Sequence, residues 1–153
     1  MKIRRPGSGR SAAAIFDESA EMAAVLLDTT VLIDLLRGRQ GAVGRLRKLR
    51  AAGDRPHVCA INVEEVERGL RGERETQAAR RLFDGVEIAP LSREEGYHAG
   101  QWRRTFAARG TTLSQPDCLI AAAALAIGAR LATGNPADFP MPGVQVDHWP
   151  VGE

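Results

Sequence analysis

Short apolar segments alternate with longer helical patterns along most of the chain, and this alternation constrains the fold more than any other feature. Apolar runs of strand length occupy residues 24–27, 57–61, 86–91, 129–133 and 144–149. Strands that are separated by helices form a parallel sheet whose two faces are both covered. We therefore predict an α/β fold, a doubly wound parallel sheet with helices on both faces.

Helices are expected in the segments between the strands, at residues 29–38, 41–53, 62–72, 73–85, 92–110 and 114–128. Asn62 and Ser92 are the predicted N-caps of two of them, because their short polar side chains can accept a hydrogen bond from the first turn. The last helix contains the run CLIAAAALAIGA, which is apolar on nearly every side and therefore predicts burial.

The 153 residues suit a single domain with a substantial core. Residues 1–21 are polar, interrupted by Pro6, Gly7 and Gly9, and nearly neutral, so we expect a flexible extension followed by one domain over residues 22–153. Met22 directly precedes the first strand, which makes it a candidate natural start. No apolar run reaches membrane-spanning length and no signal-peptide pattern is visible, so a cytoplasmic protein with no membrane partner is expected.

Several chemistries are disfavoured by what the chain contains. The two cysteines, Cys59 and Cys118, stand in apolar segments and predict small buried hydrophobes, not a disulfide framework. The three histidines have no partner at zinc-like spacing. Neither a Ser–His–Asp elbow nor a phosphate-binding glycine loop is present.

Acidic and amide side chains stand at the ends of several apolar runs. Asp28 follows the first strand directly, and Asn135 follows the strand at 129–133 by two residues. Ligands of parallel α/β sheets gather at the carboxyl ends of the strands, so both residues should lie at one functional edge. Glu65, Asp117 and Asp138 are the further acids of this set, and carboxylates without matching Lys suggest a divalent metal.

Each of these residues also has an ordinary structural interpretation. Asp28 is in position to cap the next helix, although Thr29 and Thr30 can serve instead. Asp117 lies in a first helical turn, where a carboxylate complements the helix dipole. Glu65 has charged neighbours and can be a solvated helix residue, while Asn135 and Asp138 can shape a turn beside a proline.

Basic residues form two groups. The first lies within residues 35–53, which contain no acid, and the second includes Arg103, Arg104 and Arg109. Local positive charge suits a polyanion such as nucleic acid, and a solvated helix face is the alternative.

Taken in order, LLDTTVLIDLLRG, NVEEVERG and PDCLIAAAALAIGARLATGNPADF resemble the PIN domain, and more narrowly the VapC-type toxins of bacterial VapBC toxin–antitoxin modules. The resemblance covers residues 24–149. It implies metal-site acids at Asp28, Glu65 and Asp117, with Mg²⁺ or Mn²⁺ as the cofactor. Thr29 and Thr133 are then supporting residues.

The chain departs from this pattern at one position. Many relatives carry Asp where this chain has Asn135. Two alternatives stay open: Asp138 supplies the charge, or Asn135 binds through its carbonyl or a water. With fewer carboxylates, one tightly bound ion is expected, the second arriving with substrate.

The function that the resemblance implies is a type II toxin, an endoribonuclease that cleaves structured RNA such as tRNA or rRNA by a metal-activated water. The residues expected to bind the RNA backbone are Arg45, Arg47, Arg50, Arg103 and Arg104. A cognate VapB-type antitoxin and a homodimer formed through helices between residues 30 and 84 are likewise implied. The alternatives are a non-catalytic or DNA-directed PIN-like module. A haloacid-dehalogenase-type phosphohydrolase needs a second Asp where Thr30 stands.

Overall fold

All five strands of the protein belong to one parallel sheet in the computed structural model, which describes residues 23–153. The predicted extension at residues 1–21 lies outside the described residues. The strands are β1 (Ala24–Leu27), β2 (Arg55–Val58), β3 (Glu87–Ile88), β4 (Arg130–Thr133) and β5 (Val146–His148). Their order in the sheet is β3-β2-β1-β4-β5, and every neighbouring pair is parallel.

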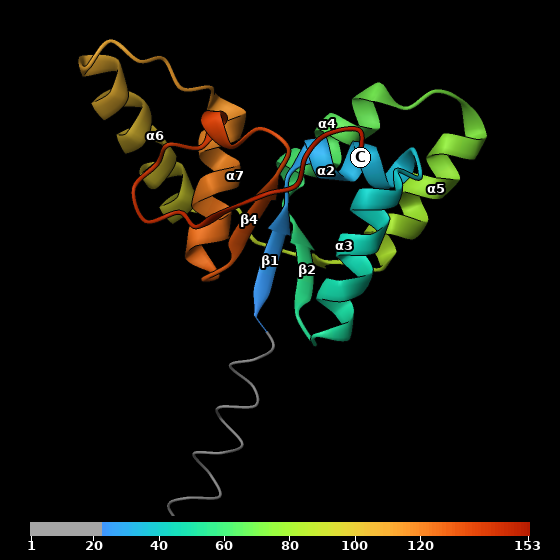
Figure 1. The fold of residues 1–153 in the computed structure, drawn as a ribbon. Helices are drawn as coiled ribbons and strands as arrows, with labels where there is room; N and C mark the ends of the chain where they lie inside the picture. Colours follow the sequence, from blue (N-terminus) through green and yellow to red (C-terminus); the bar gives the residue numbers. More distant parts are fainter. Residues whose placement is uncertain (1–22) are drawn as a thin grey trace, which may run out of the picture.

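Helices cover both faces of this sheet. They are α2 (Thr29–Leu36), α3 (Gln40–Ala51), α4 (Ala60–Gly69), α5 (Gly72–Asp84), α6 (Arg93–Ala108) and α7 (Gln115–Ala126), with a short 3₁₀ turn, η1, at Pro136–Asp138. Helices α6 and α7 lie on one side of the strands, and α3 and α5 lie on the other (Figure 1). The predicted doubly wound α/β fold is confirmed.

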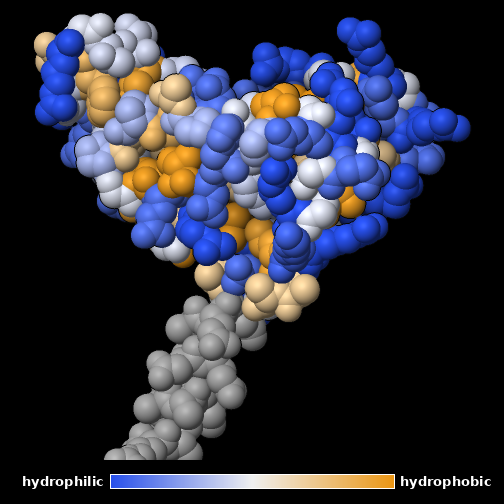
Figure 2. Space-filling model, viewed as in Figure 1, coloured by the Kyte–Doolittle hydropathy of each residue, from blue (hydrophilic) through white to orange (hydrophobic). Residues whose placement is uncertain are grey.

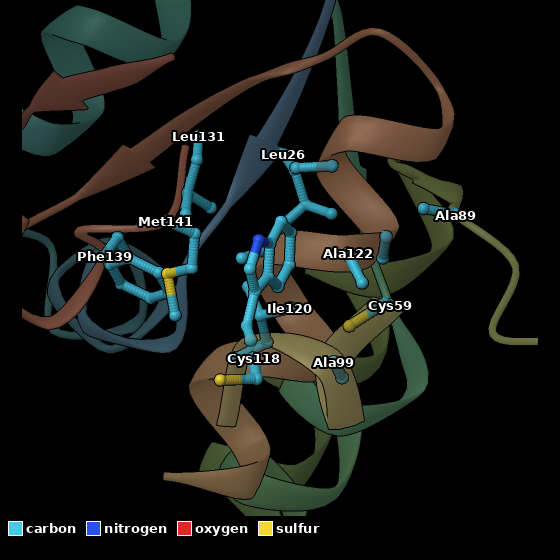
Figure 3. Packing of buried hydrophobic residues seen from close by; sticks show 14 of the residues in the cluster. Leu26, Cys59, Ala89, Ala99, Cys118, Ile120, Ala122, Leu131, Phe139 and Met141 are labelled. Atoms are coloured by element: carbon cyan, nitrogen blue, oxygen red, sulfur yellow. The ribbon is translucent and has the colours of Figure 1, made fainter. Parts of the chain in front are cut away.

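The core is divided between the two faces because successive side chains of a strand point to opposite sides. Leu26 of β1 and Leu131 of β4 pack toward α7, among the residues drawn in Figure 3. Val25 and Leu27, the neighbours of Leu26 in β1, join the second cluster against α2 and α3. The predicted burial of the apolar helix is confirmed, since the alanines at 121–124 of α7 are all buried.

One predicted helix start is wrong and one is confirmed. Ser92 is the N-cap of α6, and Glu95 completes its capping box. Helix α4, however, begins at Ala60 with Cys59 as N-cap, so Asn62 lies inside the first turn. The strand predicted at 57–61 correspondingly ends at Val58. The cause is the Asn62 side chain, whose Oδ1 accepts the Cys59 N–H at 2.9 Å and favours an earlier helix start.

The remaining expectations concern cysteines and membranes. Cys59 and Cys118 are both free and buried, which confirms their prediction as small hydrophobes. None of the helices within residues 23–153 has both the length and the apolar character needed to cross a bilayer.

Candidate functional site

The carboxyl ends of β1 and β4 place Asp28 and Asn135 at the same edge of the sheet. These strands are neighbours, and the Asp28 N–H donates to the Ala132 carbonyl at 2.8 Å, which continues their pairing by one residue. Helix α4 contributes Glu65 to this region and the first turn of α7 contributes Asp117. The edge predicted from the strand ends is therefore where the acids meet.

Asp28 is the most buried of these acids, with 6% of its surface exposed. Its Oδ2 accepts hydrogen bonds from the hydroxyls of Thr133 at 2.7 Å and Thr30 at 3.1 Å. Asp28 occupies the N-cap position of α2 but makes no side-chain capping hydrogen bond. Burial raises the pKa of Asp28, and these hydrogen bonds oppose the rise only in part.

Both threonine hydroxyls beside Asp28 are oriented by backbone groups of the loop after β4. The Gly134 N–H donates to Thr30 Oγ1 at 2.9 Å, and the Asn135 N–H donates to Thr133 Oγ1 at 3.0 Å. Because each hydroxyl oxygen accepts one of these bonds, its proton is directed to Asp28. The loop thus holds the carboxylate in one orientation.

Glu65 receives its own hydroxyl donor. Thr29 Oγ1 donates to Glu65 Oε1 at 2.9 Å, so the hydroxyl of the predicted supporting residue Thr29 serves Glu65 rather than its chain neighbour Asp28. The Arg68 guanidinium lies 4.0 Å from Glu65 Oε2, one turn along α4. The Glu65 side chain is 24% exposed, which places it at the border between core and solvent.

Asp117 combines a capping position with membership of the acidic group. Its N–H donates to the Ser114 hydroxyl at 3.2 Å, so Ser114 is the cap of α7 and the Asp117 carboxylate is not needed for that role. Burial raises the pKa of Asp117, and the negative charges of Asp138, Asp28 and Glu65 raise it further. The charges of the other three acids therefore all act on Asp117.

Asn135 and Asp138 form a turn and also carry charge toward the site. Asn135 Nδ2 donates to Asp138 Oδ2 at 2.7 Å across η1, and both side chains are exposed. The turn interpretation is correct for their backbone, since the Asp138 N–H donates to the Asn135 carbonyl at 3.1 Å. The Asp138 charge nevertheless raises the pKa of Asp28 and of Asp117, so this residue belongs to the same electrostatic group.

The donor set fits a hard divalent cation in its chemistry. It consists of carboxylate and amide oxygens, which Mg²⁺ prefers, and their mutual repulsion is what a cation relieves. Within residues 23–153, however, no three acidic, His or Cys side chains are arranged as a ready ligand set for one ion. The side chains converge, but they do not stand in a coordination geometry.

The raised pKa values predict how stability depends on pH in metal-free protein. A carboxyl whose pKa is higher in the folded than in the unfolded state destabilises the fold above that pKa, and the penalty disappears as pH falls. In EDTA, Asp117→Asn should therefore be more stable than wild type at about pH 7, and the gap should narrow toward about pH 4. Urea unfolding of both proteins across this pH range measures the difference in their free energies of unfolding. If that difference grows as the pH falls, charge repulsion does not destabilise the metal-free fold at Asp117.

The structure does not bring the two predicted arginine groups together. Arg45, Arg47 and Arg50 lie on α3 and Arg103 and Arg104 on α6, on opposite sides of the sheet. Three of the five are engaged within the chain: Arg45 pairs with the Glu153 carboxylate at 3.3 Å, Arg50 donates to the Gly85 carbonyl and Arg103 to the Leu113 carbonyl. Arg47 and Arg104 are exposed. Hydrophilic side chains dominate the surface over α3 and α5 (Figure 2).

A groove that the sequence did not predict has Glu65 among its lining residues. It has a volume of about 410 Å³ and runs between α2, α4 and α5. Its apolar wall includes Ile33, Leu36 and Leu70, and its rim carries Arg37 and Arg71. The apolar residues of its wall can be recognised in the sequences of three separate helices. Which of these residues face one another, however, depends on how the helices pack.

Asn62 is the polar residue of the site that sequence reasoning placed in the wrong role. It is fully buried, and its Nδ2 donates to Thr29 Oγ1 at 3.2 Å. Its position three residues before Glu65 on the same helix was the available signal, because residues at that spacing share a helix face.

The chain is similar in sequence to ribonucleases of two bacterial species. Ribonuclease VapC19 of Mycobacterium tuberculosis is 30% identical over 116 residues, which are 76% of this chain and 92% of that protein. Ribonuclease VapC1 of Haemophilus influenzae is 26% identical over 118 residues, or 74% of this chain and 88% of its own length.

Solved structures of toxin–antitoxin complexes share the fold. A chain of the toxin–antitoxin complex from Klebsiella pneumoniae matches with a TM-score of 0.63 and 29% identity, over 78% of this chain and 94% of that one. A chain of VapBC2 from Rickettsia felis, bound to a promoter DNA fragment, matches with a TM-score of 0.74 and 21% identity, over 82% of this chain and 98% of that one. The family model of the PIN domain matches residues 25–140, a span that contains all five acidic and amide residues predicted for the site. The chain therefore belongs to the PIN domain family.

Proposed function

We propose that this protein is a metal-dependent endoribonuclease and the toxin of a type II toxin–antitoxin module. The observation that carries the proposal is the convergence of Asp28, Glu65 and Asp117 at one sheet edge, where the charges of Asp28 and Glu65 both raise the pKa of Asp117. The kinship with curated VapC ribonucleases supports the same reaction.

Asp28, Glu65 and Asp117 are the proposed ligands of one tightly held Mg²⁺ or Mn²⁺. When bound, the ion supplies a water of lowered pKa for attack on phosphorus and neutralises charge on the leaving oxygen. Thr30 and Thr133 orient Asp28, and Thr29 orients Glu65. Asn135 and Asp138 complete the acidic rim through charge and hydrogen bonding.

Structured RNA with an exposed single-stranded loop, such as tRNA or rRNA, is the proposed substrate. Among the five arginines predicted to bind RNA, Arg47 and Arg104 are exposed and make no ion pair or side-chain hydrogen bond within residues 23–153, whereas Arg45, Arg50 and Arg103 already bind within the chain. Binding that rests on phosphate contacts weakens as salt rises. A homodimer through the helices between residues 30 and 84 stays a prediction.

A VapB-type antitoxin is the proposed protein partner, and the groove between α2, α4 and α5 is its proposed docking site. The relative from Klebsiella pneumoniae comes from a toxin–antitoxin complex. The groove offers an apolar wall for an amphipathic segment and has Glu65 in its lining, so a segment seated in it contacts one of the proposed metal ligands. Occupation of this groove blocks the site without any change of fold.

Metal removal is the experiment that tests the proposed reaction. Purified protein incubated with total bacterial RNA should produce discrete fragments in Mg²⁺ or Mn²⁺ and none in EDTA, because the acids alone supply neither the activated water nor the neutralising charge. Sequencing of the fragment ends identifies the bond. Added Mg²⁺ should restore the lost activity.

Controls separate the proposal from its alternatives. Asp117→Asn is purified in parallel as a control for contamination. If the fragments are absent with this variant, a contaminating ribonuclease does not explain the cleavage by wild type. Cleavage of single-stranded DNA with equal efficiency favours the DNA-directed alternative. RNA binding without cleavage in any metal favours the non-catalytic module and contradicts the proposed reaction.

A further inference from the structure

Three hydrogen bonds connect the start of α4 to Glu65 through two other side chains. The Cys59 N–H donates to Asn62 Oδ1 at 2.9 Å, Asn62 Nδ2 donates to Thr29 Oγ1 at 3.2 Å, and Thr29 Oγ1 donates to Glu65 Oε1 at 2.9 Å. Asn62 is fully buried in the middle of this chain of contacts. We call the set Cys59–Asn62–Thr29–Glu65 the amide relay.

The chemistry of the groups determines the direction of every bond in the relay. The Cys59 N–H can only donate, so the amide oxygen of Asn62 must face it and the amide nitrogen must face Thr29. That nitrogen is also only a donor, so Thr29 Oγ1 accepts from it. The single proton of the Thr29 hydroxyl is then left for Glu65. A rotation of the amide by half a turn places two donors against each other and is unfavourable.

A second capping box in the same chain shows that a cap does not require the contact between Asn62 and Thr29. In α6 the residue equivalent to Asn62 is Glu95, which is also buried. Its carboxylate oxygens return to the backbone N–H and the hydroxyl of Ser92 and complete a local box. In α4 the amide uses only its oxygen for the cap, and its nitrogen reaches 33 residues back along the chain to Thr29.

We propose that Asn62 is a positioning residue for Glu65. By holding Thr29 as a hydroxyl donor, it keeps the Glu65 carboxylate in one orientation toward the acidic group rather than toward Arg68, which lies 4.0 Å from the other oxygen. This inference rests on the proposed function, in which Glu65 is a ligand of the metal ion. Groups that orient a metal ligand typically contribute about tenfold to about 100-fold in metal affinity.

Calorimetric titration of the full chain with Mn²⁺ tests the proposal. Asn62→Ala should weaken Mn²⁺ binding about tenfold, and its RNA cleavage should recover when Mn²⁺ is raised by a similar factor. Glu95→Ala is the matched control, because it destroys a buried capping box that has no link to the acids. It should lower stability in urea while Mn²⁺ affinity stays within about twofold of wild type.

A double-mutant cycle with Thr29 isolates the relay from the cap. Thr29→Val removes the hydroxyl that connects Asn62 to Glu65. In that background Asn62→Ala should therefore weaken Mn²⁺ binding no further, although it should still lower the free energy of unfolding. Thr29→Ser keeps the hydroxyl and should retain affinity near that of wild type. Equal effects of Asn62→Ala in both backgrounds, or an effect of Glu95→Ala as large, overturn the proposal and leave the proposed function intact. A wild-type protein that binds no Mn²⁺ overturns both.

Discussion

The Asp28→Asn variant is expected to cleave RNA about 10³-fold more slowly than wild type while remaining folded. The substitution removes the charge of the most buried acid at the site but preserves its shape. Asn can still accept from Thr133 and Thr30 through its side-chain oxygen. Because burial raises the pKa of Asp28, a neutral side chain costs the metal-free fold little. Initial cleavage rates in Mg²⁺ and thermal melting in EDTA measure the two effects.

Asp147→Asn is a suitable control for this variant. Asp147 lies in β5, and its carboxylate pairs with Arg130 at 3.2 Å, outside the acidic group. Its replacement should leave the cleavage rate unchanged. An Asp28→Asn protein that fails to fold shows that the carboxylate has a structural role, and one that cleaves at the wild-type rate removes Asp28 from the site.

The largest effect on stability is expected at Leu26. This side chain is fully buried in β1, the central strand, where it packs with Leu131 and Ile120 against α7. Leu26→Ala should lower the free energy of unfolding by about 3 kcal/mol, because it removes buried methyl groups and leaves a cavity that a central strand cannot close. Equilibrium unfolding in urea, with EDTA present, measures the change.

Ile88→Ala provides the comparison for Leu26→Ala. Ile88 lies in the edge strand β3 and is 56% exposed, so its truncation should cost less than about 1 kcal/mol. Similar losses for both variants contradict the division into a buried central strand and an exposed edge. The loss in Leu26→Ala should also reduce activity only in proportion to the fraction unfolded, since the Leu26 side chain packs in the apolar cluster and not among the hydrogen-bonded groups of the site.

The fold could be predicted from the sequence because its signals are local. Strand-length apolar runs separated by helical patterns predicted the parallel sheet, and the ends of two of those runs predicted that Asp28 and Asn135 share an edge. The start of α6 at Ser92 was equally readable. The start of α4 was not, because the amide of Asn62 serves the backbone from inside the first turn, and a polar residue near a helix start does not reveal its register.

The sequence by itself identified the candidate acids and predicted that Asp28 and Asn135 share one edge of the sheet. Only the tertiary structure decided which hydroxyl donates to which carboxylate. Thr29 and Thr30 are adjacent in the chain, yet Thr29 donates to Glu65 on α4 and Thr30 donates to Asp28 beside it. The two threonines have different acceptors because the side chains of neighbouring helix residues point about 100° apart. The packing of α4 against α2 therefore gives Thr29 its acceptor, and the loop after β4 orients Thr30. Hydrogen-bond direction is a property of groups distant in sequence, and local patterns do not encode it.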